Sequence, residues 1–218
     1  MVAVAESRPV EISEFKLQAL LGVPENARGL VIFAHGSGSG RLSPRNNHVA
    51  AALRRGGLVT LLLDLLMPEE ERNRANVFDI PLLASRLVLA TEWASEQPET
   101  RTLRIGYFGA STGAGAALVA AATAPDRIHA VVSRGGRPDL AGDKLPLVRA
   151  PTLLIVGGLD RPVIELNHQA QDQLRCATEL VIVPGASHLF EEAGMLDVVV
   201  QHATRWFRAH IAGPRAEA

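Results

Sequence analysis

A serine between two glycines, in the segment Gly109-Ala110-Ser111-Thr112-Gly113, is the feature of this chain that most restricts its fold. The run Arg104–Phe108 before it predicts a buried strand, and the Ala-rich run Gly115–Ala124 after it predicts a tightly packed helix. Small residues two positions before and two positions after Ser111 let the backbone turn sharply without clashes. The pattern therefore predicts a nucleophile elbow, a strand-turn-helix that exposes the serine hydroxyl.

Short β-branched or Leu-rich runs recur along the chain and are separated by longer amphipathic stretches. The expected strands are Phe15–Leu21, Leu30–Ala34, Val59–Leu63, Leu103–Phe108, Ala130–Ser133, Thr152–Val156 and Glu179–Val183. The expected helices are Asn46–Arg55, Val77–Ser95, Gly113–Ala124, Val163–Cys176 and Leu189–His210. This alternation is typical of an α/β fold with a mostly parallel sheet and helices on both faces. We predict one doubly wound domain over residues 1–218, with a flexible tail at about 213–218.

The composition excludes several classes of function. The formal net charge of −1 gives no electrostatic reason to expect nucleic acid or an anionic membrane surface as a partner. The single cysteine, Cys176, cannot form an internal disulfide. No uncharged apolar stretch approaches the length of a membrane span, and no signal-peptide core is visible near the N-terminus. We therefore expect a cytoplasmic enzyme that acts on a small molecule.

A serine hydroxyl becomes a nucleophile only when a base takes its proton, and an acid must orient that base. His188 is the candidate base, because it lies in a loop directly after the last expected strand. The alternative is that His188 is an ordinary surface residue. The other histidines downstream of the serine precede a strand or fall within expected helices, namely His129, His168, His202 and His210.

Asp160 is the candidate acid, in a loop that follows the strand before His188. It could also cap the helix that begins near Arg161-Pro162, and the two roles are compatible. Asp139, in the loop after the preceding strand, is the rival. Asp64 also follows a strand, but it comes too early for the order serine, acid, histidine.

Acyl transfer also needs hydrogen-bond donors for the developing oxyanion. We expect one from the backbone N–H of Thr112 and the other from the loop His35-Gly36-Ser37, at the N–H of Ser37. The alternative interpretation of this glycine-rich loop is a phosphate cradle. However, it lacks the lysine of a P-loop and the spacing of a dinucleotide site. His35 is interpreted as a residue that fixes the loop.

With these motifs in place, the chain resembles the α/β-hydrolase superfamily, and within it the dienelactone hydrolase-like group. The resemblance runs from the first expected strand to the last helix and is carried by His35-Gly36-Ser37-Gly38, Gly109-Ala110-Ser111-Thr112-Gly113, Leu159-Asp160 and Ser187-His188. Further stretches at 43–46, 133–139 and 186–190 are similar to a subgroup of bacterial hydrolases. Authentic dienelactone hydrolases use a cysteine nucleophile, whereas this elbow presents Ser111. The resemblance therefore implies serine esterase chemistry without a metal or an organic cofactor.

Many relatives in this superfamily carry a lid after the sixth strand. Here only 14 residues, Arg137–Ala150, separate two expected strands, so we predict no cap domain and an open site. The expected wall residues are Ser37, Arg45, Leu65, Met67, Arg134, Leu159 and Phe190. For Arg45 and Arg134 two roles remain open. Each could bind an acidic group of the substrate or form a structural salt bridge with Asp64, Asp139 or Glu191.

The leading hypothesis is a lidless serine hydrolase of carboxylic esters or lactones, with Ser111, His188 and Asp160 as its catalytic residues. One alternative is a binding module that keeps the fold without the chemistry. Another is a short-chain dehydrogenase, because the elbow glycines also match its cofactor motif. That enzyme class needs Tyr-x-x-x-Lys downstream, and the single tyrosine, Tyr107, lies upstream. An apolar helix face around Leu87 is interpreted as core or as a homodimer surface.

Overall fold

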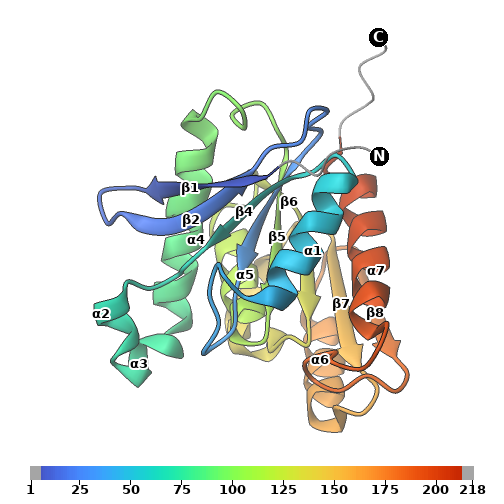
Figure 1. Cartoon of the computed structure of the whole chain (residues 1–218). Helices are drawn as coiled ribbons and strands as arrows, with labels where there is room; N and C mark the ends of the chain where they lie inside the picture. The colour runs from blue at the N-terminus through green and yellow to red at the C-terminus, as the bar shows by residue number, and fades with distance from the viewer. Residues whose placement is uncertain (1–5, 213–218) are drawn as a thin grey trace.

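The computed structural model describes residues 6–212 (Figure 1). The strands are β1 (Ser7–Ile12), β2 (Leu17–Gly22), β3 (Leu30–Ala34), β4 (Val59–Leu63), β5 (Ile105–Ala110), β6 (Ile128–Arg134), β7 (Thr152–Gly157) and β8 (Thr178–Val183). They form one sheet in the order β1-β2-β4-β3-β5-β6-β7-β8. From β3 to β8 the strands run parallel, while β2 runs antiparallel to β1 and β4.

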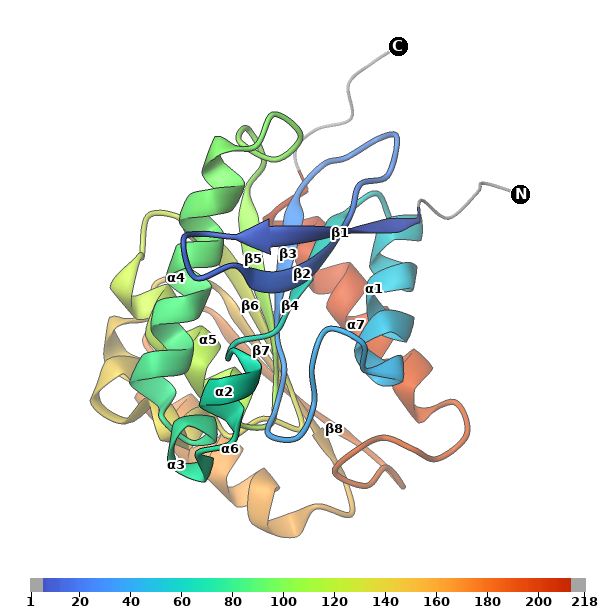
Figure 2. The same ribbon diagram turned by 60° about the vertical axis from the view of Figure 1, so that its left-hand side comes forward.

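Helices cover both faces of the sheet (Figure 2). On one face lie α4 (Ile80–Glu96), α5 (Thr112–Thr123) and α6 (Arg161–Gln173). On the other face lie α1 (Pro44–Arg55) and α7 (Met195–His210), which pack against each other. The prediction of a doubly wound, mostly parallel α/β fold is therefore confirmed.

The central strand β3 shows why the apolar runs of the sequence are continuous. Its five residues are all buried, but they belong to two different clusters of the core. Leu30 and Ile32 pack with α4 and α5, whereas Val31 and Phe33 pack with α1 and α7. Because successive side chains of a strand point to opposite faces, a strand covered on both sides needs apolar residues throughout.

Some elements were not expected from the sequence. In the edge strand β1 only Ile12 is buried, so the strand lacks the continuous apolar run of a strand that is covered on both faces. Two single-turn helices, α2 (Pro68–Glu71) and α3 (Arg74–Val77), precede α4. The long helix itself begins later than expected, because the carboxylate of Asp79 caps it by accepting a hydrogen bond from the N–H of Leu82 at 2.9 Å.

Two expected helix boundaries were wrong. Helix α6 ends at Gln173, so Cys176 lies beyond the helix, half-buried beside Thr178. Helix α7 begins only at Met195, which leaves Leu189 in a loop. The segment between β6 and β7 contains only the short 3₁₀ element Pro138–Leu147, in agreement with the expected lack of a cap.

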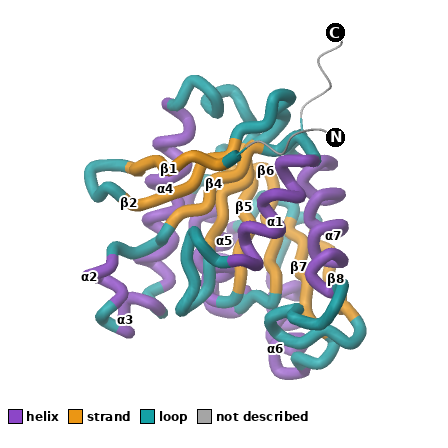
Figure 3. Tube along the Cα trace, viewed as in Figure 1, coloured by secondary structure: helices purple, strands orange, loops and turns teal. Residues whose placement is uncertain are grey.

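The loops that follow β3, β5, β6, β7 and β8 meet at the carboxyl edge of the parallel strands (Figure 3). This edge is where open α/β sheets bind ligands. None of the helices within residues 6–212 has the length and hydropathy needed to cross a bilayer. The tail predicted at 213–218 lies outside the described residues.

Candidate active site

Ser111 occupies the turn between β5 and α5 with a strained backbone, at φ 50° and ψ −124°. Positive φ is uncommon for a residue with a side chain. The flanking glycines make the turn sterically possible. A Cβ at Gly109 would lie 2.5 Å from the Cα of Ala114, and a Cβ at Gly113 would lie 2.2 Å from the carbonyl oxygen of Ala34. Both obstacles are backbone atoms that cannot move aside, so the strand-turn-helix depends on these two glycines.

The loop after β3 lies directly against the elbow. A Cβ at Gly36 would come within 2.8 Å of the Cβ of Ser111. His35 holds this loop in place. The N–H of Leu65 donates to Nε2 of His35 at 3.0 Å, so Nδ1 carries the ring proton and donates it to the carbonyl oxygen of Gly36 at 3.0 Å. This geometry agrees with the interpretation of His35 as a residue that fixes the loop.

The expected oxyanion donors come from the loop after β3 and from the start of α5. Ser37 lines a cavity together with Ser111, and no hydrogen bond within residues 6–212 uses its N–H. Thr112 is the first residue of α5, and amides of the first helical turn have no partner within the helix. The two N–H groups are therefore available to a ligand.

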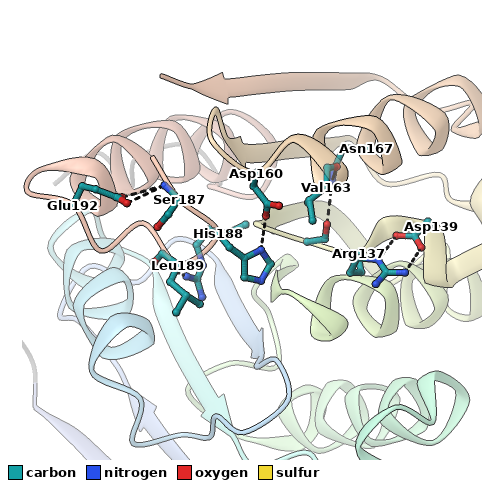
Figure 4. Close-up of polar contacts among 11 residues, drawn as sticks. Arg137, Asp139, Asp160, Val163, Asn167, Ser187, His188, Leu189 and Glu192 are labelled. Carbon is teal, nitrogen blue, oxygen red and sulfur yellow. Dashed lines mark hydrogen bonds and ion pairs between the residues drawn. The ribbon is translucent and has the colours of Figure 1, made fainter. Parts of the chain in front are cut away.

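His188 and Asp160 approach each other at the ends of β8 and β7 (Figure 4). Nδ1 of His188 lies 2.6 Å from Oδ2 of Asp160. Asp160 occupies the N-cap position of α6, but its side chain makes no capping hydrogen bond. Asp160 therefore occupies the N-cap position expected from the sequence, but its carboxylate contacts the imidazole of His188 and not the amides of the helix.

Asp139, the rival acid, has a different partner (Figure 4). Nε and Nη2 of Arg137 donate to its two carboxylate oxygens, each at 2.8 Å. Such a bidentate pair uses both oxygens and holds the side chain in one orientation. The side-chain hydrogen bonds of Asp139 are therefore made to Arg137 and not to the imidazole of His188.

Two residues that sequence reasoning missed support the loop of His188. Both carboxylate oxygens of Glu192 accept from the N–H of Ser187 at 3.1 Å. The pKa of Glu192 is lowered by hydrogen bonding to the side chain of Ser187, and then by the N–H groups of Glu192 itself and of Ser187. Asn167 donates from Nδ2 to the carbonyl oxygen of Gly136 at 3.1 Å, next to Gly135. A Cβ at Gly135 would meet the carbonyl oxygen of His188 at 2.7 Å. Asn167 could have been found from the sequence, because it is a polar residue at a buried position of an expected helix.

A cavity of about 520 Å³ opens above these residues. Its wall comes from the loops after β3, β5, β6 and β8. The lining residues are Gly36, Ser37, Gly38, Ser39, Gly40, Ser43, Pro44, Arg45, Ala110, Ser111, Arg134, His188 and Leu189. The structure thus brings Ser111 and His188 to one cavity, as the sequence predicted for a nucleophile and its base.

Four of the expected wall residues do not line this cavity. Leu65 is buried in the core, and Met67 packs against the same core. Leu159 is 65% exposed and is not among the residues that line the cavity of Ser111. Phe190 is 1% exposed and packs with the cluster under α1 and α7. Leu159 and Phe190 therefore do not line the cavity of Ser111, because a loop position does not determine which way a side chain points, and their roles as substrate contacts stay predictions.

The two candidate arginines behave differently. Arg45 forms an ion pair with Glu191, with Nη1 and Oε1 2.8 Å apart, which is one of the two roles left open by the sequence. Arg134 is 7% exposed, and no carboxylate within residues 6–212 lies within 4.0 Å of it. Burial, and secondarily the positive charge of Arg45, lower the pKa of Arg134 from 12.5 to about 10. Arg134 therefore remains protonated at neutral pH.

Together these groups can support attack by a hydroxyl on a carbonyl carbon. Ser111 supplies the hydroxyl, His188 can accept its proton, and the N–H groups of Ser37 and Thr112 can receive an oxyanion. Within the part of the chain that the structure describes, no group of three His, Cys, Asp or Glu side chains could hold a metal ion.

Comparisons with known sequences identify the family of the chain. The family model of the dienelactone hydrolase family matches residues 17–209. Two curated proteins from Mycobacterium tuberculosis, each named as a phosphoribosyl transferase, are 62% identical over 194 residues. The match covers 89% of this chain but 44% of their length, so the chain spans less than half of these relatives.

Solved structures give the same assignment. A dienelactone hydrolase from Anabaena variabilis has a TM-score of 0.91 and 57% identity, with 95% of this chain and 98% of that chain covered. Est1E from Butyrivibrio proteoclasticus has a TM-score of 0.79 at 16% identity, with 94% and 98% covered, which shows a shared fold. The resemblance found in the sequence motifs is confirmed. The chain belongs to the dienelactone hydrolase family of the α/β-hydrolase superfamily.

Proposed function

We propose that this protein is a serine hydrolase that cleaves carboxylic esters or lactones through an acyl-enzyme intermediate. The observation that carries the proposal is the strained backbone of Ser111 at a cavity that it shares with His188. A left-handed conformation at a residue with a side chain costs about 1–3 kcal/mol, and such strain is concentrated at functional sites. The 2.6 Å contact between His188 and Asp160 supports the same proposal.

The first half-reaction forms the acyl-enzyme. Oγ of Ser111 attacks the carbonyl carbon while Nε2 of His188 takes the hydroxyl proton. Asp160 accepts the hydrogen bond from Nδ1–H of His188, which leaves the lone pair of Nε2 free to accept a proton and stabilises the imidazolium. The oxyanion is stabilised by the N–H groups of Ser37 and Thr112. Collapse of the tetrahedral intermediate breaks the ester C–O bond, and the imidazolium protonates the departing alkoxide.

The second half-reaction returns the enzyme to its starting state. A water molecule attacks the acyl carbon while His188 accepts one of its protons. The oxyanion forms again at the same two N–H groups. Collapse then breaks the bond to Oγ of Ser111, which regains its proton from His188 and releases the carboxylic acid. When the substrate is a lactone, the alcohol and the acid leave as one molecule.

The name of the Mycobacterium tuberculosis relatives carries no proposal for this chain. The match covers 44% of their length, so more than half of each relative lies outside it. In this chain, the family model of the dienelactone hydrolase family matches residues 17–209. The proposed activity therefore follows from the site of this chain.

The test is covalent labelling with a fluorophosphonate probe, which forms a bond from phosphorus to an activated serine oxygen and releases fluoride. Wild-type protein should be labelled and should hydrolyse 4-nitrophenyl acetate. Ser111→Ala should lose both properties. Ser39→Ala removes another serine of the same cavity and should keep them.

Folded wild-type protein that is neither labelled nor active on esters would contradict the proposal and would favour a non-catalytic binding module. Labelling that survives in Ser111→Ala would also contradict it, because another residue would then be the nucleophile.

A further inference from the structure

Asp64 is a charged residue near the site that the proposed reaction does not use. It directly follows β4, too early in the chain to be the acid of the triad. Arg45 and Arg134 were its possible partners from the sequence, but the structure pairs it with Arg41. Both members of this pair lie outside the residues that line the cavity of Ser111. The pair therefore joins β4 to the loop that carries Arg41 and is not part of the wall that a substrate would contact.

That loop, residues 35–43, runs from β3 to α1 and is called the β3–α1 loop below. Six of its residues line the cavity of Ser111, and it carries the N–H of Ser37, the proposed oxyanion donor. The N–H groups of Ser39 and Ser43 each close a turn within the loop. Such bonds shape the loop but do not attach it to the sheet. Its position relative to the nucleophile therefore depends on contacts with other elements.

The end of β4 holds the β3–α1 loop at two points. Oδ1 of Asp64 accepts from the N–H of Arg41 at 2.7 Å, and Oδ2 forms an ion pair with the guanidinium of the same residue. The next residue, Leu65, donates its N–H to Nε2 of His35 at 3.0 Å. The histidine begins the loop and the arginine lies in its later part. Two adjacent residues at the end of one strand thus bracket the segment that carries Ser37.

Asp64 is itself held by the sheet. Its N–H donates to the carbonyl oxygen of Gln18 in β2 at 2.9 Å, which continues the antiparallel pairing of β2 with β4. The carboxylate and the guanidinium of Arg41 are both partly buried. A charge-assisted hydrogen bond in such surroundings is stronger than one between neutral groups. Asn47 of α1 adds a further contact, because its Nδ2 donates to the carbonyl oxygen of Arg41 at 2.8 Å.

Gly40 shows how closely the loop approaches the carboxylate. A Cβ at Gly40 would lie 2.7 Å from Oδ1 of Asp64. A larger residue at this position would displace the loop or the carboxylate, because the same oxygen already accepts from the N–H of Arg41. Gly40 lines the cavity together with Ser37 and Ser111. The contact with Asp64 is therefore made three residues from the oxyanion donor.

We propose that Asp64 is a positioning residue, whose carboxylate holds the β3–α1 loop so that the N–H of Ser37 is directed at the oxyanion. This inference rests on the proposed function, because it concerns the reaction of Ser111. A donor stabilises the transition state most when it is already placed where the charge develops. A carboxylate suits this role, because one oxygen can accept from a backbone N–H while the other pairs with a guanidinium.

The first measurement is steady-state kinetics on 4-nitrophenyl acetate. Deletion of an oxyanion donor costs about 10²- to 10³-fold in kcat, and a displaced donor should cost less. We expect Asp64→Ala to lower kcat about 10- to 100-fold and to change KM by less than about threefold, because the donor acts on the developing charge. Asp64→Asn keeps an acceptor for the N–H of Arg41 and should recover part of the loss.

A transition-state analogue separates this role from a purely structural one. Oγ of Ser111 adds to the carbonyl carbon of trifluoroacetone, its proton passes to His188, and the resulting hemiketal oxyanion meets the same donors. The inhibition constant should rise in Asp64→Ala by about the factor by which kcat/KM falls. Rates are calculated per site titrated with the fluorophosphonate probe, so that unfolded protein is not counted. Asp126→Ala is the matched control, because it removes an exposed carboxylate paired with Arg149 and should change neither constant.

The close approach of Gly40 gives a second, independent test. Gly40→Ala places a Cβ against Oδ1 of Asp64 and should lower kcat about tenfold or more. In Asp64→Ala that oxygen is absent, so the added Gly40→Ala should lower kcat by less than about threefold. Full additivity of the two losses would overturn the proposal, since the two residues would then act separately.

Hydrogen exchange separates this inference from the proposed function. The N–H groups of Ser39 and Ser43 bond within the loop and not to Asp64, and NMR should show them exchanging at least about threefold faster in Asp64→Ala. Amides of β7 should not change. Unchanged exchange, or unchanged kcat and inhibitor affinity, would overturn the role of Asp64 even if Ser111 is labelled and active. Wild type that is neither labelled nor active, with exchange that still depends on Asp64, would contradict the proposed function and leave Asp64 as an anchor of the loop.

Discussion

The imidazole of His188 and the carboxylate of Asp160 meet across 28 residues of sequence, with Nδ1 and Oδ2 2.6 Å apart. The carboxylate leaves the amides of its own helix uncapped to make this contact. A helix N-cap aspartate ordinarily contributes about 1 kcal/mol by accepting from those amides. The pairing with His188 thus replaces a local stabilising bond by one that orients an imidazole.

The first prediction concerns the choice of acid. Asp160→Asn should lower kcat on a 4-nitrophenyl ester about 10³- to 10⁴-fold, because an amide no longer holds the imidazole in the required tautomer. Asp139→Asn is the control and should change kcat by less than about threefold, since Asp139 is held by Arg137. The opposite ranking in steady-state kinetics would show that the acid is Asp139.

The second prediction concerns the loop against the elbow. Gly36→Ala places a Cβ 2.8 Å from the Cβ of Ser111, so the loop must shift away from the nucleophile. A displacement of about 1 Å at an active site can cost 10²-fold, and we expect a loss of kcat of that order. Gly38→Ala, in the same loop, meets no atom within 4 Å and strains only its backbone at φ 69°. It should lose less than about tenfold, and equal losses would refute the steric argument.

The third prediction concerns stability. Because burial lowers the pKa of Arg134, the folded state holds its charge at a cost. That cost is fully present below pH 10, where both folded and unfolded chains are protonated, and it decreases as the pH rises through the folded value. Arg134→Met should therefore raise the free energy of unfolding at pH 7, by about 1–3 kcal/mol.

Arg86→Met is the matched comparison, since Arg86 is equally buried but paired with Glu70 at 2.7 Å. Its replacement leaves a carboxylate without its partner and should destabilise the fold by about 3 kcal/mol. Urea unfolding of both variants measures the difference. Destabilisation by Arg134→Met of the same size would assign Arg134 a structural role.

The fourth prediction concerns the loop of His188. Hydrogen bonds from Ser187, together with the backbone N–H of Glu192 itself, lower the pKa of the Glu192 carboxyl. A carboxyl with a lowered folded pKa stabilises above its unfolded pKa, and this contribution disappears as the pH falls through the folded value. Glu192→Ala should reduce kcat about two- to tenfold at pH 7, because the segment before His188 loses its anchor.

Glu192→Gln keeps one acceptor oxygen for the N–H of Ser187 and should recover most of the activity. Wild type should also lose protection of the Ser187 amide from hydrogen exchange as the pH falls below the range in which Glu192 is ionised, after correction for the intrinsic exchange rate. Identical kcat in Glu192→Ala and wild type would show that the loop is held by other contacts.

Much of the fold was predictable because its signals are local. The continuous apolar runs at β3 and β4 gave strand limits that the structure reproduces, since strands buried on both faces need apolar residues throughout. The edge strand β1 was missed because most of its residues are at least partly exposed, and such a sequence resembles that of a loop. The start of α7 was misplaced because the apolar residues after His188 belong to a loop that folds into the core through Phe190.

Ser111 and its turn follow from the sequence alone. The two glycines around it are required by backbone atoms less than 3 Å away, and the strand before and the helix after are visible as periodicity. The doubly wound fold class is determined in the same way, since the alternation of apolar strands and amphipathic helices is a property of neighbouring residues.

Only the tertiary structure decided which charged groups meet. The sequence offered Asp160 and Asp139 to one histidine, and the structure joins Asp160 to His188. It offered several carboxylates to two arginines, and the structure pairs Arg45 with Glu191 while Arg134 receives none within residues 6–212. The reason is that such pairs join loops of different strands. Their distances depend on the order of the strands in the sheet and on side-chain direction, and neither is encoded by the residues adjacent in sequence.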